Sequence, residues 1–289
     1  MEGTGPHHLL SEATFRLLRE LFHDRFGLWF HDDLRFLLQL RLASRLALHG
    51  LRDFDAYRRF LRLDPRGPAE LADAAEVLTT NETYFYREPD QLRALERDIL
   101  PSLERDRRGR RRLRLLSAGC STGEEAYTLA ALLLGSGRFT GWDLEVHGVD
   151  LSRRCLARAV AGAYGEQAFR SAEGHSLRRW FHLQEGRWVV DGALRSLVHF
   201  GPANLLDGQG LPAGPFDVVL CRNVLLYFDP RARRRVLGHL HARLGEGGWL
   251  LLGHAESLLE LSADFEMVHL ERELVFRRPR AAAGGGRGP

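Results

Sequence analysis

Residues 113–125 read LRLLSAGCSTGEE: an apolar run, a loop of small residues with glycines at positions 119 and 123, and then two glutamates. The apolar run predicts a buried strand, and the apolar residues through Leu134 predict a helix after the loop. A strand, a small-residue loop and a helix in this order bring backbone N–H groups to the carboxyl edge of a sheet, where a ligand can approach closely. The stretch therefore predicts a ligand-binding loop in an α/β domain.

The identity of the ligand is constrained by the charges in this loop. A dinucleotide fingerprint requires glycine two and five positions after Gly119, but these positions hold Ser121 and Glu124. Two carboxylates at the helix start would repel a pyrophosphate by about 1–4 kcal/mol per charge pair at about 4 Å. The same carboxylates suit S-adenosylmethionine, which has no phosphate and carries a sulfonium and an ammonium. The acids thus favour this cofactor over NAD or ATP.

A hydrolase is the competing interpretation, because residues 119–123 also spell the G-x-S-x-G pattern of a nucleophile elbow. Asp217 and His254 follow Ser121 in the chain order that such a triad requires. In α/β-hydrolases, however, several strands precede the elbow, and everything upstream of residue 113 is patterned as helix. We therefore expect no triad.

Polar residues also follow the next strands. Asp150 ends the apolar run 143–150, where a carboxylate can accept hydrogen bonds from ribose hydroxyls, although it also suits a helix start before Ser152. Further short apolar runs occupy 197–201, 216–222 and 249–254, and helical stretches separate them. Alternation of this kind predicts a parallel sheet, and the runs 265–270 and 273–278 predict an antiparallel hairpin at its edge. Residues expected at the shared carboxyl edge are Asn204, Leu205, Asn223 and Val224.

The region from Ser11 to about Thr80 is patterned as helix throughout. Ser11 is typical of a helix N-cap and Gly27 of a helix end; Asp32 or Asp33 can open a second helix with the stripe Leu34, Leu38, Leu42 and Leu46. Two shorter helices are predicted at 53–63 and 68–78. Arg41 and Arg45 lie off the apolar stripe, so we expect them to face outward, either as an ordinary solvated face or as a docking surface for an acidic partner.

Composition limits the remaining possibilities. The chain has 289 residues, 44% hydrophobic and 27% charged, with net charge +3 and arginine at all 41 basic positions. A net charge of +3 is too small to indicate a nucleic-acid partner. No apolar run reaches the roughly 18 residues that span a bilayer. The N-terminus has no secretory pattern, and three scattered cysteines fit a reducing compartment, so we expect a cytoplasmic protein without a metal site. The tail 279–289 is expected to be disordered.

Taken together, these motifs resemble those of the CheR family of chemotaxis receptor methyltransferases, and the resemblance covers nearly the whole length of the chain. The matching segments are LTTNETYFYREPDQ, LLSAGCSTGEEAYTLA, GVDLS, GPANLL, FDVVLCRNVLLYFD and GGWLLLGHAESL. The resemblance implies an α/β chain: a small all-helical N-terminal domain (9–80), a linker and entry helix (81–112), and a Rossmann-like class I methyltransferase domain (113–278). A small antiparallel insertion is expected at about 178–196.

The resemblance also implies site residues. Glu125 would bind the methionine end of S-adenosylmethionine, although whether Glu124 or Glu125 makes the direct contact is left open, and Asp150 would bind the ribose. Apart from the resemblance, a planar guanidinium can fix both oxygens of a carboxylate, so we expect Arg87 to orient the substrate carboxylate. Tyr227, unless it is only a packed aromatic, is expected to supply a hydroxyl near the reaction. The implied cofactor-binding set is Asn81, Thr83, Arg87, Gly119, Glu125, Asp150, Asn204, Leu205, Asn223 and Val224. The implied receptor-docking set is Arg35, Arg41 and Arg45.

The implied reaction is methyl transfer to glutamate side chains on the cytoplasmic helical bundles of chemoreceptors, giving glutamate methyl esters and S-adenosylhomocysteine. In some relatives the insertion captures a peptide at the receptor C-terminus, and its short length here argues against that capture. Two alternatives stay open: a methyltransferase acting on RNA or a small molecule, and a non-catalytic signalling module gated by the cofactor. No aromatic residues interleave with the arginines, so nucleic acid is not an expected partner.

Overall fold

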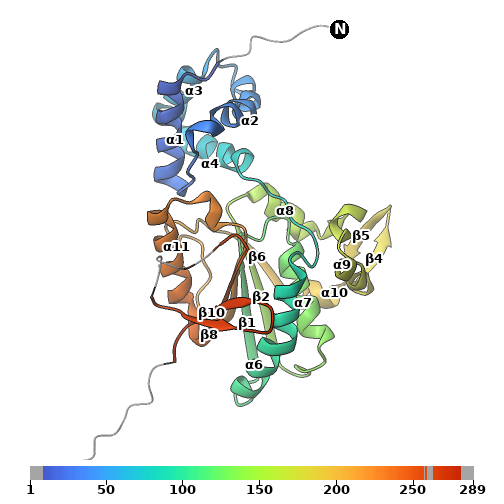
Figure 1. Cartoon of the computed structure of the whole chain (residues 1–289). Helices are drawn as coiled ribbons and strands as arrows, with labels where there is room; N and C mark the ends of the chain where they lie inside the picture. Colours follow the sequence, from blue (N-terminus) through green and yellow to red (C-terminus); the bar gives the residue numbers. More distant parts are fainter. Residues whose placement is uncertain (1–8, 257, 259–262, 281–289) are drawn as a thin grey trace, which may run out of the picture. The chain divides into compact units, whose positions relative to one another are not determined.

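The computed structural model describes residues 9–256, 258 and 263–280. They form two compact units (Figure 1). The first holds the residues up to Thr80 together with Tyr227–Ala232, and the second holds Asn81–Leu226 and the residues from Arg233 onward. The assignment of Tyr227–Ala232 to the first unit is a finding that the sequence pattern did not predict. The predicted disordered tail lies outside the described residues from position 281.

The first unit is helical, as predicted. Its elements are α1 (Glu12–Phe26), the 3-10 turn η1 (Asp32–Leu34), α2 (Arg35–Leu48), α3 (Phe54–Leu63) and α4 (Gly67–Leu78). Ser11 caps α1 by accepting from the backbone N–H of Thr14, and Gly27 ends it with φ +73°. Asp53 caps α3 in the same way. Leu34 is a correction, because it sits in η1 and is only half-buried, whereas Leu38, Leu42 and Leu46 are buried as predicted.

The second unit is built on a seven-stranded sheet with the order β6-β2-β1-β7-β8-β10-β9. Its strands are β1 (Arg112–Ala118), β2 (Asp143–Asp150), β6 (Val198–Pro202), β7 (Phe216–Cys221), β8 (Leu244–Leu252), β9 (Glu266–His269) and β10 (Leu274–Arg277). The first five strands in this order run parallel, and β10 and β9 pair antiparallel at one edge, as the sequence predicted. Strand β8 begins five residues before the predicted run, because Leu244 already pairs with Phe216.

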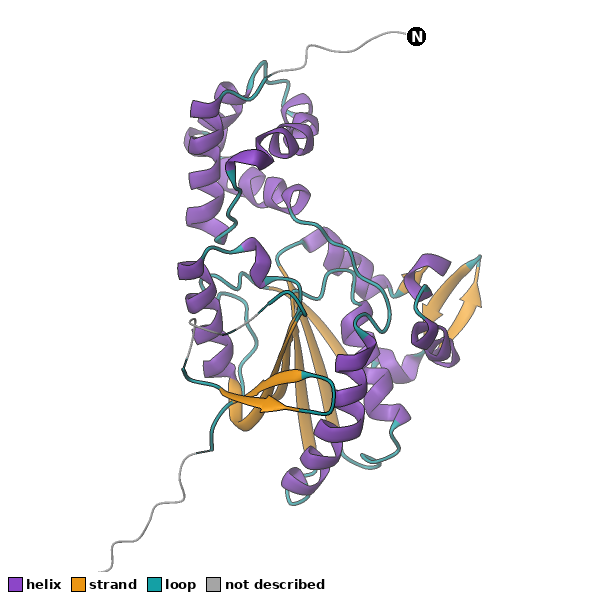
Figure 2. Ribbon diagram, viewed as in Figure 1, coloured by secondary structure: helices purple, strands orange, loops and turns teal. Residues whose placement is uncertain are grey.

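Helices cover the sheet, and Figure 2 shows α7 and α11 on its opposite sides. In the second unit, the helical elements before β1 are α5 (Pro89–Ala94), the π-helical turn η2 (Leu95–Ile99) and α6 (Leu100–Arg107). Those that follow β1 in the chain include α7 (Glu124–Gly135), α8 (Arg153–Ala161), α10 (Gly192–Arg195), the 3-10 turn η5 (Leu225–Tyr227) and α11 (Pro230–Arg243). Ser152 caps α8 through the N–H of Cys155. None of the helices in the described part of the chain combines the length and hydropathy that a membrane span needs.

A small antiparallel sheet forms the insertion and has the order β3-β5-β4. It consists of β3 (Ala163–Tyr164), β4 (Phe181–Gln184) and β5 (Arg187–Val190), with η3 (Glu166–Phe169), α9 (Ala172–Ser176) and η4 (Leu177–Trp180) between them. Phe85, fully buried, stacks on Phe169 at 4.5 Å between ring centroids and donates its N–H to Ala168 at 2.8 Å. The insertion therefore anchors residues 81–88, the segment expected to cover the cofactor.

Candidate functional site

The loop after β1 approaches its neighbours so closely that Gly119 has no room for a side chain. Its φ is +88°, and an added Cβ would lie 2.4 Å from Val224 Cγ2. Ser121 also has a left-handed φ of +48°. Such backbone conformations are costly for residues other than glycine and concentrate at functional sites. The loop is thus packed tightly against the turn after β7, and the approach of a ligand to it stays a prediction.

Asp150 at the end of β2 fixes the same loop. Its Oδ2 accepts the N–H of Ser121 at 2.7 Å, and its Oδ1 accepts the N–H of Ser152 at 2.8 Å. Each oxygen of the carboxylate thus accepts a backbone N–H, one from the glycine loop and one from the start of α8. The geometry is compatible with both interpretations of Asp150, as an acid at the start of α8 and as a ligand-binding carboxylate. The same side chain accepts an N–H at the start of α8 and an N–H in the loop.

The two glutamates at the start of α7 have different surroundings. Glu124 is buried and accepts from the hydroxyl of Thr122 at 2.7 Å, and burial raises its pKa. Glu125 accepts from the hydroxyl of Ser117 at 2.6 Å and lies 3.2 Å from Nη1 of Arg222. Burial raises the pKa of Glu125, and the positive charge of Arg222 opposes that rise. Of the two glutamates, Glu125 is the one that forms an ion pair with a charged residue at the end of a neighbouring strand, Arg222.

Arg222, directly after β7, links the site residues, and the sequence analysis gave it no role. Its side chain is only 2% exposed, and Nη2 lies 3.1 Å from Glu88 Oε2 and donates to the carbonyl of Arg87. Burial by itself raises the pKa of Glu88, but Arg222 and Asn223 outweigh burial and hold it below its usual value. The signal that could have found Arg222 is its position, since it is a charged residue directly after the fully buried strand FDVVLC.

Asn223 is held beside this cluster with a left-handed φ of +60°. Its Nδ2 donates to Glu88 Oε1 at 3.2 Å, while its buried Oδ1 has no hydrogen-bond partner among the described residues. A buried acceptor without a donor is rare in folded proteins and suits a ligand that brings one. The side chain of the next residue, Val224, packs against Gly119.

Segment 81–88, which precedes α5, also contacts the loop after β1. The carbonyl of Asn81 accepts from the hydroxyl of Ser121 at 3.2 Å, and Thr83 is half-buried. Arg87 is half-buried and donates from Nη1 to the carbonyl of Glu82 at 2.6 Å. Tyr86 and Glu88 both have left-handed φ values, +60° and +57°. The structure therefore brings Asn81 and Arg87 into the neighbourhood of Gly119, Glu125 and Asp150.

Asn204 and Leu205 follow β6, the strand next to β2. The N–H of Ala203 donates to the carbonyl of Asp150 at 3.0 Å, so this turn is tied to the end of β2. Asn204 Oδ1 accepts from the N–H of Leu206 at 3.0 Å, and Leu205 is buried. Both residues lie at the carboxyl edge, where the sequence placed them.

Tyr227 belongs to the first unit. Its hydroxyl donates to the carbonyl of Thr80 at 3.2 Å, and its own carbonyl accepts from the N–H of Trp29 at 2.9 Å. Its involvement in the reaction stays a prediction.

The expectation that Arg41 and Arg45 face outward is wrong for Arg45. Its side chain is 16% exposed and pairs with Glu70, which is 3% exposed, and with Asp73. Arg41 is half-buried and donates to the carbonyl of Leu78 and, at 3.2 Å, to the hydroxyl of Thr80. Arg35 is exposed. The stripe Leu38, Leu42 and Leu46 correctly predicted the buried face of α2. It could not show that residues of α4 bind the arginines that lie beside this face.

The triad geometry is absent, as expected. Asp217 lies near the start of β7 and Ser121 follows the end of β1; because these strands are parallel, the two residues belong to opposite edges of the sheet. Asp217 is bound by Arg107 and Arg110 instead.

The three cysteines are buried and free, and burial raises the pKa of each. Among the described residues no group of histidine, cysteine and acidic side chains has the arrangement of a metal site.

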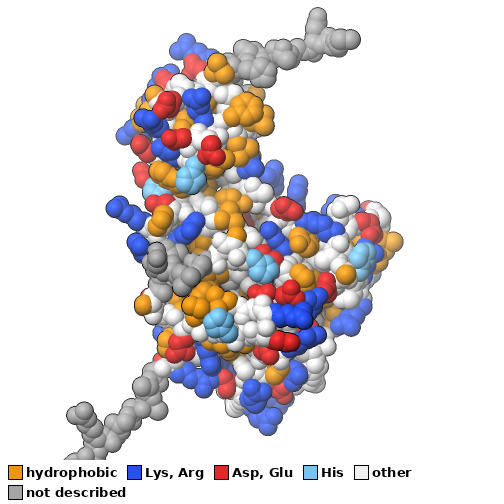
Figure 3. All heavy atoms as spheres, viewed as in Figure 1, with side chains coloured by type: hydrophobic (Ala, Val, Ile, Leu, Met, Phe, Trp, Pro, Cys, Tyr) orange, Lys and Arg blue, Asp and Glu red, His pale blue; other side chains and the backbone are white. Residues whose placement is uncertain are grey.

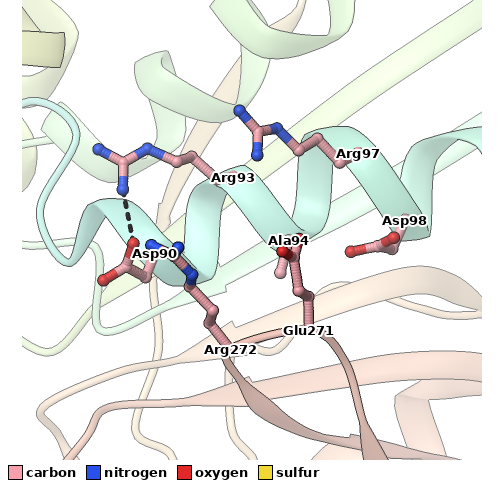
Figure 4. A pocket seen from close by; sticks show the side chains of 7 residues that line it. All are labelled: Asp90, Arg93, Ala94, Arg97, Asp98, Glu271 and Arg272. Carbon is pink, nitrogen blue, oxygen red and sulfur yellow. Dashed lines mark hydrogen bonds and ion pairs between the residues drawn. The ribbon is translucent and has the colours of Figure 1, made fainter.

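A separate pocket of about 200 Å³ lies between the α5–η2 segment and the β9–β10 turn (Figure 4). Its lining residues are Asp90, Arg93, Ala94, Arg97, Asp98, Glu271 and Arg272. Arg93 and Asp90 pair at 2.5 Å, and arginines and acids are equal in number in this lining. Because the charges balance and no predicted site residue takes part, the pocket has no role in the site described above.

Comparisons with known proteins give matches to both parts of the chain. A family model described as CheR methyltransferase, all-alpha domain, matches residues 13–79, and one described as CheR methyltransferase, SAM binding domain, matches residues 81–274. Chemotaxis protein methyltransferase 2 of Vibrio cholerae serotype O1 is 30% identical over 274 residues, covering 94% of both chains. The probable biofilm formation methyltransferase WspC of Pseudomonas aeruginosa is 37% identical over 84% of this chain and 56% of its own length. Among solved structures, the N-methyltransferase NodS of Bradyrhizobium japonicum, in complex with S-adenosyl-L-homocysteine, matches with a TM-score of 0.37 and 17% identity over 58% of this chain and 79% of that chain.

Proposed function

The chain belongs to the CheR methyltransferase family, and from this premise we propose that it transfers a methyl group from S-adenosylmethionine to glutamate side chains of chemoreceptors. The products are glutamate methyl esters and S-adenosylhomocysteine. The observation that carries the proposal is the pair of carboxylates, Glu125 and Asp150, on either side of the tight loop at Gly119. Their charge suits a ligand that is cationic and lacks phosphate.

The residues present fit this cofactor. The unpartnered Oδ1 of Asn223 offers an acceptor, and the loop at Gly119 leaves backbone rather than side chain facing the edge of the sheet. Glu125 would hold the ammonium group, Asp150 the ribose hydroxyls, and Asn204 with Leu205 the adenine. Asn81 and Thr83 would cover the cofactor from segment 81–88.

When bound, S-adenosylmethionine supplies a methyl group on a positively charged sulfur, which a carboxylate oxygen can attack in line. A glutamate has an ordinary pKa near 4.3, so the substrate is already ionised at neutral pH and the protein needs no general base. The protein's task is to align the substrate oxygen and to exclude water from it. We assign the alignment to Arg87, because a guanidinium can bind both oxygens of a carboxylate.

Docking of the receptor would involve Arg35, the exposed arginine at the start of α2. Arg41 and Arg45 would contribute less directly, since both already bind groups within the first unit. The substrate is proposed to be the helical bundle of the receptor, because exposed glutamates on a helix form an acidic face that an arginine can contact.

The experiment that tests the proposal is incubation of the purified chain with methyl-labelled S-adenosylmethionine and the chemoreceptors encoded beside it. Label should appear on the receptor and leave as volatile methanol in mild base, which marks a methyl ester. Receptor variants with glutamine at the methylated positions are the matched control and should remain unlabelled. Base-stable label, or label on RNA from the same cells, would contradict the proposal.

The surface view gives no support to a nucleic-acid substrate. On the face shown in Figure 3, arginines and acidic side chains alternate over the described residues of both units. Binding to a polyanionic backbone requires a continuous basic stripe.

A further inference from the structure

Glu256 lies in the segment GHAES after β8, which the family resemblance includes but to which neither the sequence nor the reaction assigns a role. Its carboxylate is an acceptor for backbone N–H groups. Oε2 accepts from Asn223 and from Gly253, both at 2.8 Å, and Oε1 accepts from Val224 at 2.8 Å and from Leu226 at 3.3 Å. One carboxylate thus serves four amides.

These amides come from the ends of two neighbouring parallel strands. Asn223, Val224 and Leu226 follow β7, and Gly253 follows β8. Within the part of the chain that the structure describes, no other acceptor serves the N–H groups of Asn223 and Val224. The shape of the turn after β7 therefore depends on a side chain more than thirty residues away in sequence.

The turn that Glu256 holds is the one that faces the cofactor loop. Asn223 has a left-handed φ of +60°, which residues other than glycine seldom adopt, and this conformation presents its buried, unpartnered Oδ1. Val224 Cγ2 occupies the space that a side chain at Gly119 would need. Both features require the turn to keep its present position.

Gly253 shows how tightly the carboxylate is enclosed. An added Cβ there would lie 2.8 Å from the backbone nitrogen and from Nδ2 of Asn223, and 2.9 Å from Glu256 Oε2. A side chain at position 253 would therefore push Asn223 and Glu256 apart.

We propose that Glu256 is a positioning residue: its carboxylate holds the turn Asn223–Leu226 in the shape that presents Asn223 and Val224 to the cofactor, without touching the cofactor itself. The inference rests on the proposed function, because it assumes that the cofactor binds at this turn.

The test compares the whole chain with the variant Glu256→Gln. In either orientation of the amide, an NH₂ group that cannot accept replaces one carboxylate oxygen, so at least one backbone N–H of the turn loses its acceptor. We expect the affinity for S-adenosylhomocysteine, measured by titration calorimetry, to fall at least tenfold. We also expect amide hydrogen exchange in peptides covering 221–228 to become faster. In the methylation assay the KM for S-adenosylmethionine should rise while the KM for the receptor stays unchanged.

Two further variants separate positioning from general loss of structure. Glu256→Asp keeps the charge with shorter reach and should give an intermediate affinity, and Gly253→Ala should weaken binding although Glu256 is intact. Glu266→Gln, at an exposed position of β9, is the matched control and should behave as the wild type.

These measurements distinguish failure of the positioning role of Glu256 from failure of the proposed function. If the wild-type chain does not bind S-adenosylhomocysteine, the proposed function fails. If the wild type binds and both Glu256→Gln and Gly253→Ala bind equally well, with unchanged exchange in 221–228, the positioning role of Glu256 is overturned.

Discussion

Nη1 of Arg222 lies 3.2 Å from Oε2 of Glu125, and the arginine side chain is almost completely buried. The same guanidinium lies 3.1 Å from Glu88, so one buried cation faces two carboxylates. The three charges sum to minus one, and the half-buried guanidinium of Arg87, which also acts on Glu125, offsets part of this excess. A buried negative charge without full compensation is unfavourable, and a cationic ligand removes that cost.

The Arg222–Glu125 pair predicts a pH dependence of cofactor binding. The pKa of Glu125 is raised by burial, and Arg222 limits that rise. If Glu125 holds the cofactor's ammonium, as proposed above, binding requires the ionised carboxylate, so affinity should fall as the pH is lowered through this pKa. In Arg222→Met the pKa of Glu125 rises further, and the fall in affinity should move up by about one pH unit or more, as expected for loss of an opposite charge at this distance.

Calorimetric titration of S-adenosylhomocysteine between pH 5.5 and 8 measures this shift. Glu125→Gln is the control, since it has no charge to lose and should bind weakly with a flat profile in this range. Identical pH profiles for the wild type and Arg222→Met would show that Glu125 does not receive the cation.

Asp150→Ala is predicted to bind the cofactor 10- to 100-fold more weakly. The carboxylate accepts the N–H groups of Ser121 and Ser152, so its removal loosens the glycine loop as well as removing acceptors for the ribose. Hydrogen bonds to a charged group are worth about 1.5–3 kcal/mol each, which converts to this range of affinities. Asp143→Ala, at an exposed position at the other end of β2, is the comparison and should bind like the wild type. Unchanged affinity in Asp150→Ala would refute the ribose assignment.

Local features of the fold were predictable from the sequence. Ser11 was recognisable as a cap because a cap interacts with an N–H only two or three residues away. The helices expected to start at Asp53 and Ser152 prove to have these residues as their caps. The parallel strands were predictable because each is a short apolar run between helical stretches. The glycine loop was predictable because its small residues and its carboxylates are contiguous.

Features that depend on distant contacts were not predictable. Glu70 lies 25 residues from Arg45, and Glu256 lies 30 to 33 residues from the residues of the turn that it supports. A single sequence contains no signal that pairs such residues, so Arg45 was expected to face outward and Arg222 received no role. The grouping of Tyr227–Ala232 with the helical unit is of the same kind, since it depends on contacts such as the bridge between Leu28 and Phe228.

Arg87→Ala is predicted to abolish receptor methylation while leaving cofactor binding weakened but detectable. The guanidinium is half-buried and makes one hydrogen bond, to the carbonyl of Glu82, so its loss leaves no buried charge unpaired. Label transfer to the receptor reports turnover, and calorimetry reports binding. Arg97→Ala, an exposed arginine on η2, should match the wild type in both assays. Full turnover in Arg87→Ala would remove this residue from the reaction.

The last prediction concerns the helical unit and the buried carboxylate of Glu70. Tyr57 donates to it at 2.6 Å, His49 lies at 2.5 Å and Arg45 forms an ion pair with it. Burial alone raises the pKa of Glu70, but the hydrogen bonds from these three residues outweigh burial and hold the pKa below its usual value. Removing one member of such a buried group typically costs about 3–5 kcal/mol, whereas Asp73, which is 62% exposed, should contribute less than about 1 kcal/mol.

Urea unfolding should therefore show that Glu70→Gln destabilises the helical unit by about 3 kcal/mol near neutral pH, while Asp73→Asn changes stability little. Trp29, the one tryptophan in the sequence of this unit, provides a fluorescence signal together with far-UV circular dichroism. Because the folded-state pKa of Glu70 is lowered, its contribution is complete above the unfolded-state pKa near 4.5 and is lost as the pH falls toward the folded-state value. The difference between wild type and Glu70→Gln should consequently shrink below pH 4.5. A difference that stays constant down to acid pH, or an unaltered stability in Glu70→Gln, would mean that Arg45 is not fixed through Glu70 and is available to a partner after all.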